Sequence, residues 1–291
     1  MIHQFLNVIA PVFIAITLGW CWGKLGRPYD TDLVSSLVMN ISAPCLVFST
    51  LSNLSISPYL LGQMGIATVI AITLFGLIGA AVLWFTGLPQ RGFLSPLMFA
   101  NIGNMGLPLC LFAFGKPGLA LAIVVFSVFC VGQFTIGLWL YSGATSPVYL
   151  LKFPVIYAVF LALFFLVGEL RPPEWIGKTT ELLGDFTIPL MLLTLGVSLA
   201  RLEVMNIKRA LSLSILRLGM GFGVGILVSS LMHLTGTARG VLILQCSMPV
   251  AVFNYLLSER YNRNSRETAE LVVVSTLLSL VTLPLILRFL S

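Results

Sequence analysis

Long apolar stretches follow one another along the whole chain, separated by short polar breaks or breaks rich in proline and glycine. An apolar helix of about 20 residues is long enough to cross the hydrocarbon core of a bilayer. The pattern predicts ten membrane-spanning helices, with approximate bounds of 4–24, 31–52, 59–87, 91–115, 117–143, 147–168, 175–200, 208–233, 237–259 and 267–290. We therefore expect an all-α polytopic membrane protein.

The two halves of the chain place their prolines similarly. Three pairs of segments align in order: ISAPCLVFSTL (41–51) with FTIPLMLLTLG (186–196), PLCLF (108–112) with PVAVF (249–253), and PVF (11–13) with PVI (154–156). The offsets are 145, 141 and 143 residues (189 minus 44, 249 minus 108, 154 minus 11). Because each half holds an odd number of spans, five, the second half must be inverted. The sequence predicts two inverted repeats, 1–145 and 146–291, as in many secondary transporters.

Composition agrees with a membrane protein. Only 9% of the residues are charged and the mean hydropathy is +1.04, whereas about 25% of a soluble domain is charged. The net charge of +6 does not indicate nucleic-acid binding, because the basic residues lie in short loops. Five cysteines lie singly within apolar runs without metal-ligand spacing, so we expect neither a metal nor another cofactor: Cys21, Cys45, Cys110, Cys130 and Cys246.

The distribution of basic residues predicts the orientation in the cell membrane. With the N-terminus outside, ten basic residues lie on the inner side: Lys24, Arg27, Arg91, Lys152, Arg201, Lys208, Arg209, Arg260, Arg263 and Arg266. Five lie on the outer side: Lys116, Arg171, Lys178, Arg239 and Arg288. The positive-inside rule therefore favours both termini outside.

Two predicted spans are interrupted near their middle by amides, small residues and a proline. Span 91–115 contains NIGNMGLPL (101–109), and span 237–259 contains QCSMP (245–249). Proline removes a backbone donor and clashes with the preceding turn. Unwound backbone at membrane depth is tolerated only where it is buried in protein or lines a wet cavity. We expect the two breaks to meet back to back at the centre of the protein.

These breaks are the candidate substrate site. A broken helix offers free N–H groups and a partial positive charge at each new N-terminus, which suits a carboxylate without a basic side chain. Amide side chains add donors and acceptors. The expected substrate-binding residues are Asn101, Gly103, Asn104, Gly106, Pro108, Gln245, Ser247, Pro249 and Asn254. The alternative is that the prolines only kink packed helices.

Two charged residues fall inside predicted spans. Asp185 precedes Pro189 by one turn and is a candidate for proton coupling, because intramembrane acids are costly and usually functional. Alternatively, that span begins later and Asp185 lies at the outer interface. We expect Arg217 to snorkel to the interface, the alternative being that it attracts anions into the inner vestibule. No cluster of acids resembles a sodium site.

Three segments carry a family resemblance: NIGNMGLPL (101–109), QCSMPVAVFNYLLSERY (245–261) and IPLMLLTLGVSLARL (188–202). They resemble the auxin efflux carrier family, which includes bacterial relatives of plant PIN carriers. The resemblance covers essentially the whole chain from LNVIAPVFIAITLGW (6–20) onward. It implies a ten-helix fold similar to bile-acid transporters and sodium/proton antiporters, with crossed broken helices four and nine.

The resemblance also implies a function. Spans 1, 2, 6 and 7 would form a scaffold, and spans 3–5 and 8–10 a transport core that carries a small organic anion by alternating access. Asn101 and Gln245 match the polar crossover positions of the family, and the resemblance also allows a homodimer through the scaffold helices. This chain lacks the long cytosolic loop of many plant members, so we expect neither plant-type control by phosphorylation nor auxin as substrate.

Two other classes of function were weighed against a carrier. An intramembrane enzyme needs convergent His, Cys, Asp or Glu side chains, and the sequence holds no HExxH motif or similar set. We therefore do not expect an enzyme. A channel or an anion-sensing receptor on the same scaffold stays open as an alternative. Transport measurements would separate a channel from a carrier, because a channel passes anions only downhill whereas a coupled carrier can concentrate them.

Overall fold

The computed structural model describes residues 2–52, 57–143, 154–168, 170–202 and 207–290, and these residues form helices with one isolated antiparallel bridge. Within them, six helical stretches are long and apolar enough to cross a membrane: Thr31–Ser52, Tyr59–Phe85, Ile102–Ser142, Glu174–Arg201, Ile207–Leu231 and Ser265–Leu290. The prediction of an all-helical polytopic membrane protein is confirmed.

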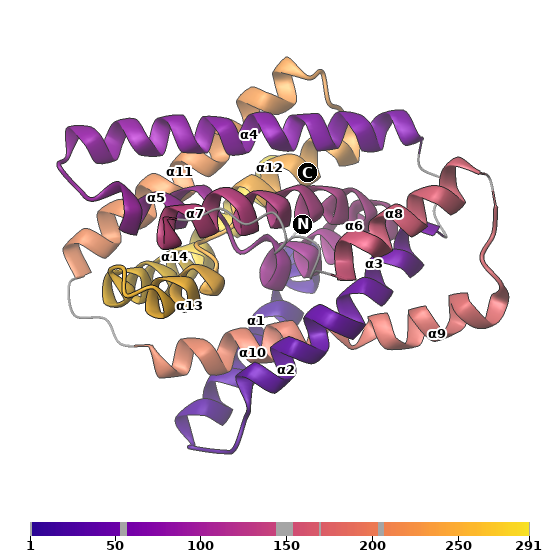
Figure 1. Ribbon diagram of the computed structural model, residues 1–291, viewed down its shortest axis with the longest axis horizontal. Helices are drawn as coiled ribbons and strands as arrows, with labels where there is room; N and C mark the ends of the chain where they lie inside the picture. The colour runs from indigo at the N-terminus through magenta and orange to yellow at the C-terminus, as the bar shows by residue number, and fades with distance from the viewer. Residues whose placement is uncertain (1, 53–56, 144–153, 169, 203–206, 291) are drawn as a thin grey trace.

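Figure 1 shows the order and arrangement of the helices. The first part of the chain forms α1 (Ile2–Lys24), α2 (Thr31–Leu37), the π-helical turn η1 (Val38–Ser42), α3 (Ala43–Ser52) and α4 (Pro58–Phe85). Next come α5 (Gln90–Met98), the π-helical turn η2 (Ile102–Gly106), α6 (Leu107–Gly132), a third π-helical turn η3 (Gln133–Gly137) and α7 (Leu138–Ser142). The remainder forms α8 (Pro154–Val167), α9 (Glu174–Asp185), α10 (Thr187–Arg201), α11 (Ile207–Leu231), α12 (Gly236–Cys246), α13 (Val252–Arg260) and α14 (Ser265–Leu290).

The two spans predicted to be interrupted are each divided into half-helices. The halves α5, α12 and α13 have 9, 11 and 9 residues, which is too short to cross a bilayer alone. The fourth half is the start of α6, which turns sharply at Gly115, where φ is +68°. The sequence predicted the end of a span at this GKPG segment. The predicted repeat boundary at 145/146 lies outside the described residues.

The helices pack in two groups. One group brings α1 against α10, and α3 against α8 and α9. The other surrounds α6 with α4 and α12, with α11 and α14 packed beside them. The crossing of α1 and α10 is close enough that a Cβ atom on Gly196 would collide with the backbone of Ile16 and Trp20. In Figure 1, α4 runs across the upper part of the molecule and α9 and α10 lie along its lower part.

Candidate functional site

The two helix breaks lie directly against each other. Ala100 and Val250 form an antiparallel bridge, and the backbone N–H of Asn101 donates to the carbonyl of Pro249 at 2.7 Å. Each extended segment therefore satisfies backbone groups of the other, which unwound chain inside a membrane requires. The expectation that the breaks meet is confirmed.

The two prolines do not hold equivalent places in these breaks. The non-helical residues of the first break are Phe99–Asn101, and helix resumes at Ile102. Pro108 lies near the start of α6, which continues η2 without interruption, so this proline stands inside a helical stretch that began at Ile102. Pro249 lies within the extended linker between α12 and α13. The interpretation that the first break extends from Asn101 to Pro108 is wrong, because helix resumes at Ile102, six residues before that proline.

A cavity of about 200 Å³ adjoins the crossing. One wall is formed by η2, α6, η3 and the start of α13, and the facing wall by α2, η1 and α10. Five phenylalanines contribute to an apolar lining: Phe99, Phe126, Phe129, Phe134 and Phe253. Polar side chains also face it: Thr31, Asp32, Ser35, Asn101, Asn104, Gln133, Thr194 and Ser198. The cavity therefore suits a small molecule with an apolar body and a polar end.

Both half-helix N-termini of the crossing open onto this cavity. Residues 102–104 at the start of η2 and residues 251–253 at the start of α13 all line it. The first N–H groups of a helix lack intrahelical acceptors and carry a partial positive charge. Among the described lining residues, the charged side chain is Asp32. An anion bound here would therefore be held by helix ends and amides.

Asn101 has the geometry of a ligand-binding amide. Its side chain is 3% exposed and lines the cavity, and its Nδ2 has no hydrogen-bond partner among the described residues. Its backbone is fixed, because its carbonyl accepts from the N–H groups of Met105 and Gly106 at 3.3 and 3.2 Å. A rigid backbone therefore presents an unused donor at the cavity wall.

Gly103 and Asn104 join Asn101 at the cavity, whereas the other predicted substrate-binding residues do not line it: Gly106, Pro108, Gln245, Ser247, Pro249 and Asn254. Ser247 is fully buried and its Oγ donates to the carbonyl of Ile243 at 2.7 Å. Gln245 is also fully buried, and its amide packs against Gly106 so closely that a Cβ atom there would collide with its Oε1. These residues lie behind the cavity.

Asn254 supports the first break from the other half of the chain. Its Nδ2 donates to the carbonyl of Phe99 at 2.9 Å, just past the end of α5. Its Oδ1 accepts from Ser95 Oγ at 2.8 Å and from Gln133 Nε2 at 3.4 Å. The buried network places Asn254 in a supporting role.

The cavity residues outside the two breaks were not predicted from the sequence. Gln133 lies in an apolar run of its span, FCVGQFTIG (129–137), with no proline beside it. Thr194 faces the cavity from α10, and its hydroxyl lies 2.8 Å from that of Tyr29. A lone amide in an apolar run was an available signal for Gln133, whereas nothing in the sequence distinguishes Thr194 from other threonines of the spans.

The expectation that Arg217 snorkels to the membrane interface is wrong. Its side chain is fully buried, its Nη2 donates to the carbonyl of Cys246 at 3.1 Å, and its guanidinium carbon lies 4.7 Å from the ring centre of Phe75. The side chain points inward because the end of α12 offers an acceptor beside α11. Asp185 ends α9, is exposed and does not line the cavity. The described residues contain no cluster of three or more potential metal ligands.

Comparison with known proteins gives a consistent result. A family model described as membrane transport protein matches residues 142–287. An uncharacterized transporter of Methanocaldococcus jannaschii is 24% identical over 299 residues, covering 96% of this chain and 97% of that protein. An uncharacterized transporter of Methanothermobacter thermautotrophicus is 27% identical over 293 residues, covering 96% of each chain. The similarity to both relatives therefore extends over nearly the full length.

Proposed function

The chain belongs to the membrane transport protein family, and we propose that it is a secondary-active carrier whose substrate is a small organic anion. Membership implies a multi-pass protein of a lipid bilayer that carries a small molecule, and the family is one of transporters rather than enzymes. The observation that supports an anionic substrate is the cavity onto which both half-helix N-termini open.

The carboxylate of the substrate would bind between residues 102–104 and 251–253. A carboxylate has about four acceptor positions, which two helix N-termini and one amide can satisfy together. Asn101 would supply the amide through its unused Nδ2. The apolar part of the substrate would pack on the phenylalanines of the lining. A buried carboxylate is costly unless its oxygens accept hydrogen bonds, and no basic side chain lines the described part of the cavity. The N–H groups of both helix ends and the Asn101 amide would therefore all be needed.

We propose that the architecture is two inverted repeats of five spans, as in the auxin efflux carriers and their relatives. The order of elements supports this. A long helix, α4 or α11, is followed in each half by two half-helices and then by a further long helix. The spans that precede it are also interrupted at matching places, by η1 before Pro44 and by the junction of α9 and α10 before Pro189. The proposed repeats are 1–145 and 146–291.

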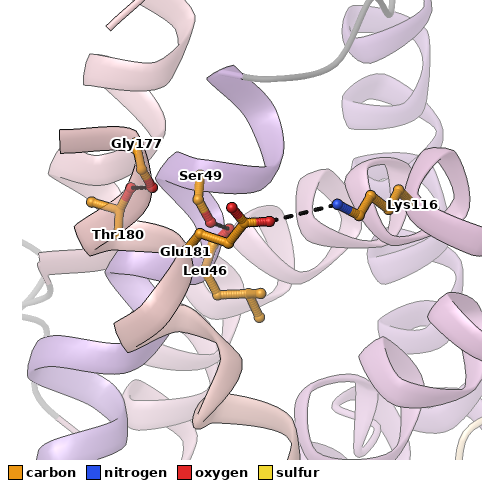
Figure 2. Close-up of polar contacts among 6 residues, drawn as sticks. All are labelled: Leu46, Ser49, Lys116, Gly177, Thr180 and Glu181. Carbon is orange, nitrogen blue, oxygen red and sulfur yellow. Dashed lines mark hydrogen bonds and ion pairs between the residues drawn. The ribbon is translucent and has the colours of Figure 1, made fainter. Parts of the chain in front are cut away.

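Alternating access would follow from movement of one packed group against the other. The scaffold would contain α1–α3 and α8–α10, and the core would contain α4–α7 and α11–α14. A homodimer would form through the scaffold helices, and this movement does not require it. The cavity lies between these groups. Elsewhere the groups meet through an ion pair, Lys116 Nζ of α6 to Glu181 Oε1 of α9 at 3.6 Å (Figure 2).

The proposed orientation has both termini outside the cell. The cavity includes Thr31 and Ser198, which lie close in sequence to Arg27 and Arg201. The positive-inside rule assigns these arginines to the cytoplasm. On this proposal the cavity opens toward the cytoplasm, and the Lys116–Glu181 pair lies on the outer side.

Uptake into proteoliposomes tests the proposed function. Purified protein is reconstituted and offered a panel of labelled mono- and dicarboxylates, each with and without a pH gradient. Saturable accumulation above the external concentration is expected for one class of acid. Uptake that stops at equal concentrations indicates a channel, and no uptake or binding of any carboxylate contradicts the proposal.

Proton coupling through Asp185 forms a separate part of the proposal. We expect Asp185→Asn to abolish accumulation driven by a pH gradient while exchange of internal for external substrate continues, because only the coupling step needs a titratable group. Glu174, which is exposed on the same helix and does not line the cavity, provides the matched control, Glu174→Gln, which retains pH-driven accumulation. Full pH-driven accumulation by the Asp185→Asn protein removes Asp185 from the coupling step.

A further inference from the structure

We propose that Arg217 is a fixed positive charge of the transport site, which binds the end of α12 and makes the crossing prefer anions to neutral molecules of the same shape. The inference rests on the proposed function above. Arg217 does not line the cavity, so its role is to set the electrostatic potential at the crossing rather than to contact the substrate.

The burial of Arg217 is the first observation. Its side chain is the largest of the fully buried ones, and it forms no ion pair among the described residues. Only Nη2 has a hydrogen bond there, whereas Nε and Nη1 have none. Arginine is almost never fully buried unless it is paired, and an intramembrane charge is costly. A charge kept in such a place indicates a function that a neutral side chain would not perform.

The end of α12 explains where the charge is held. Cys246 is the last residue of this half-helix, and its carbonyl accepts the hydrogen bond from Arg217. The C-terminus of a helix carries a partial negative charge that a cation complements. Gly221 lets α11 approach closely, because a Cβ atom there would collide with the Cys246 carbonyl and lie 3.0 Å from Nη1. Phe75 of α4 covers the guanidinium from the other side.

A short path of contacts joins this charge to the cavity. Cys246 follows Gln245, whose amide packs against Gly106 at the end of η2. Gly106 is two residues from Asn104, which lines the cavity. Buried charges act over several ångströms in a medium of low effective dielectric constant. The charge of Arg217 therefore adds to the partial positive charges of the two half-helix N-termini on the cavity side.

Substitution of Arg217 gives the main test. The probes are acids and their neutral amides of nearly equal shape: benzoate with benzamide, butyrate with butyramide, and succinate with succinamide. Binding to purified protein is measured by calorimetry. For an acid that binds, we expect Arg217→Met to weaken its affinity about tenfold and that of its amide less than about twofold, as for the loss of one nearby charge. Arg217→Lys, the matched control, retains the charge and the preference for the acid.

Ser214 allows a second test with Arg217 in place. Ser214 is fully buried, its Oγ has no partner among the described residues, and it lies three residues before Arg217 on α11. Residues three apart are neighbours on a helix surface. We expect Ser214→Asp to neutralise the charge and to weaken binding of the acid about as much as Arg217→Met does, whereas Ser214→Asn does not.

The possible outcomes separate this inference from the proposed function. Failure of every acid to bind the wild-type protein contradicts the proposed function and the inference together. Equal binding of an acid and its amide by the wild-type protein overturns only the role of the charge. Unchanged preference for the acid in both Arg217→Met and Ser214→Asp also overturns it. If Arg217→Met does not fold, the Ser214→Asp and Ser214→Asn pair decides.

Discussion

The two helix breaks have similar sequences and different surroundings. The first, at Phe99–Asn101, continues into residues 102–104 on the cavity wall, and the neutral amide of Asn254 donates to the carbonyl of Phe99. The second follows Cys246, and a charged guanidinium, that of Arg217, donates to its carbonyl. The two breaks therefore differ in the charge of the side chain that supports them.

Exposure to the cavity differs in the same way. Asn101 and Asn104 of the first break line the cavity, whereas Gln245 and Ser247 of the second are fully buried behind it. The second break contributes to the cavity through the start of α13. On the proposed function, the first break would bind substrate with side chains, and the second would supply backbone dipoles and support for the crossing.

The largest loss of stability and transport is expected from a substitution that forces α11 away from the second break. Gly221→Ala places a methyl group against the backbone carbonyl of Cys246, which cannot move without shifting α12. Overpacking of this kind costs about 1–3 kcal/mol. We expect a clear loss of thermal stability and of transport, measured by unfolding of the purified protein and by uptake. Gly219→Ala is the matched control, because no atom lies within 4 Å of a Cβ there, and similar losses in both variants contradict the account.

A smaller loss is expected from removing the support of the first break. Asn254→Ala leaves the Phe99 carbonyl and Ser95 hydroxyl without their partner in a buried network. A neutral hydrogen bond contributes about 1 kcal/mol net, and alanine forces no backbone apart, so we expect the loss of stability to be smaller than that of Gly221→Ala. Asn40→Ala serves as control, because Asn40 is exposed and bonds only within its own turn, to Ser36. Thermal unfolding is the measurement, and equal stability of the Asn254→Ala and wild-type proteins argues against the supporting role.

Substitutions in the two breaks should differ in their effect on the affinity for the acid, with little effect on stability. We expect Asn101→Ala to weaken acid binding about tenfold, or about 1.4 kcal/mol, because its Nδ2 has no partner among the described residues and is free for the substrate. Gln245→Met, of similar shape, should change affinity less than about twofold because Gln245 does not line the cavity. Calorimetry measures both. A stronger effect from Gln245→Met reverses the assignment of the breaks.

The smallest effect is expected away from both breaks. Lys116 and Glu181 form an ion pair at 3.6 Å, and both side chains are more than half exposed. Exposed pairs contribute about 0–1 kcal/mol. Glu181→Gln should therefore change the free energy of unfolding by less than about 1 kcal/mol, with Glu174→Gln, which breaks the exposed pair with Lys178, as control. A loss as large as that of Gly221→Ala would mean that the outer contact holds the fold.

The crossing itself was predictable because amides, glycines and prolines inside apolar runs are costly unless they meet a partner. The alternation of apolar runs and breaks was enough to predict an all-helical membrane protein. The place of each proline was not predictable, since proline occurs both in extended linkers and within helices, as Pro249 and Pro108 show. The burial of Arg217 was not predictable either, because its position along its own span does not show that it faces the C-terminal end of α12.

The candidate site was predicted in part for a related reason. Asn101, Gly103 and Asn104 line the cavity, and their unusual composition marked them. Side chains such as Thr194 come from the facing wall, and only the packing of α10 against η2 brings them there. A pattern within one span identifies a break, whereas the cavity depends on contacts between spans.

Anomalous diffraction from crystals grown with a brominated analogue of the transported acid tests the central claim most directly. We expect a bromine peak inside the cavity and the carboxylate within about 3 Å of N–H groups in residues 102–104 and 251–253, the usual hydrogen-bond distance. A bromine peak outside this cavity, for an acid that the protein transports, would contradict the assignment of the crossing as the substrate site.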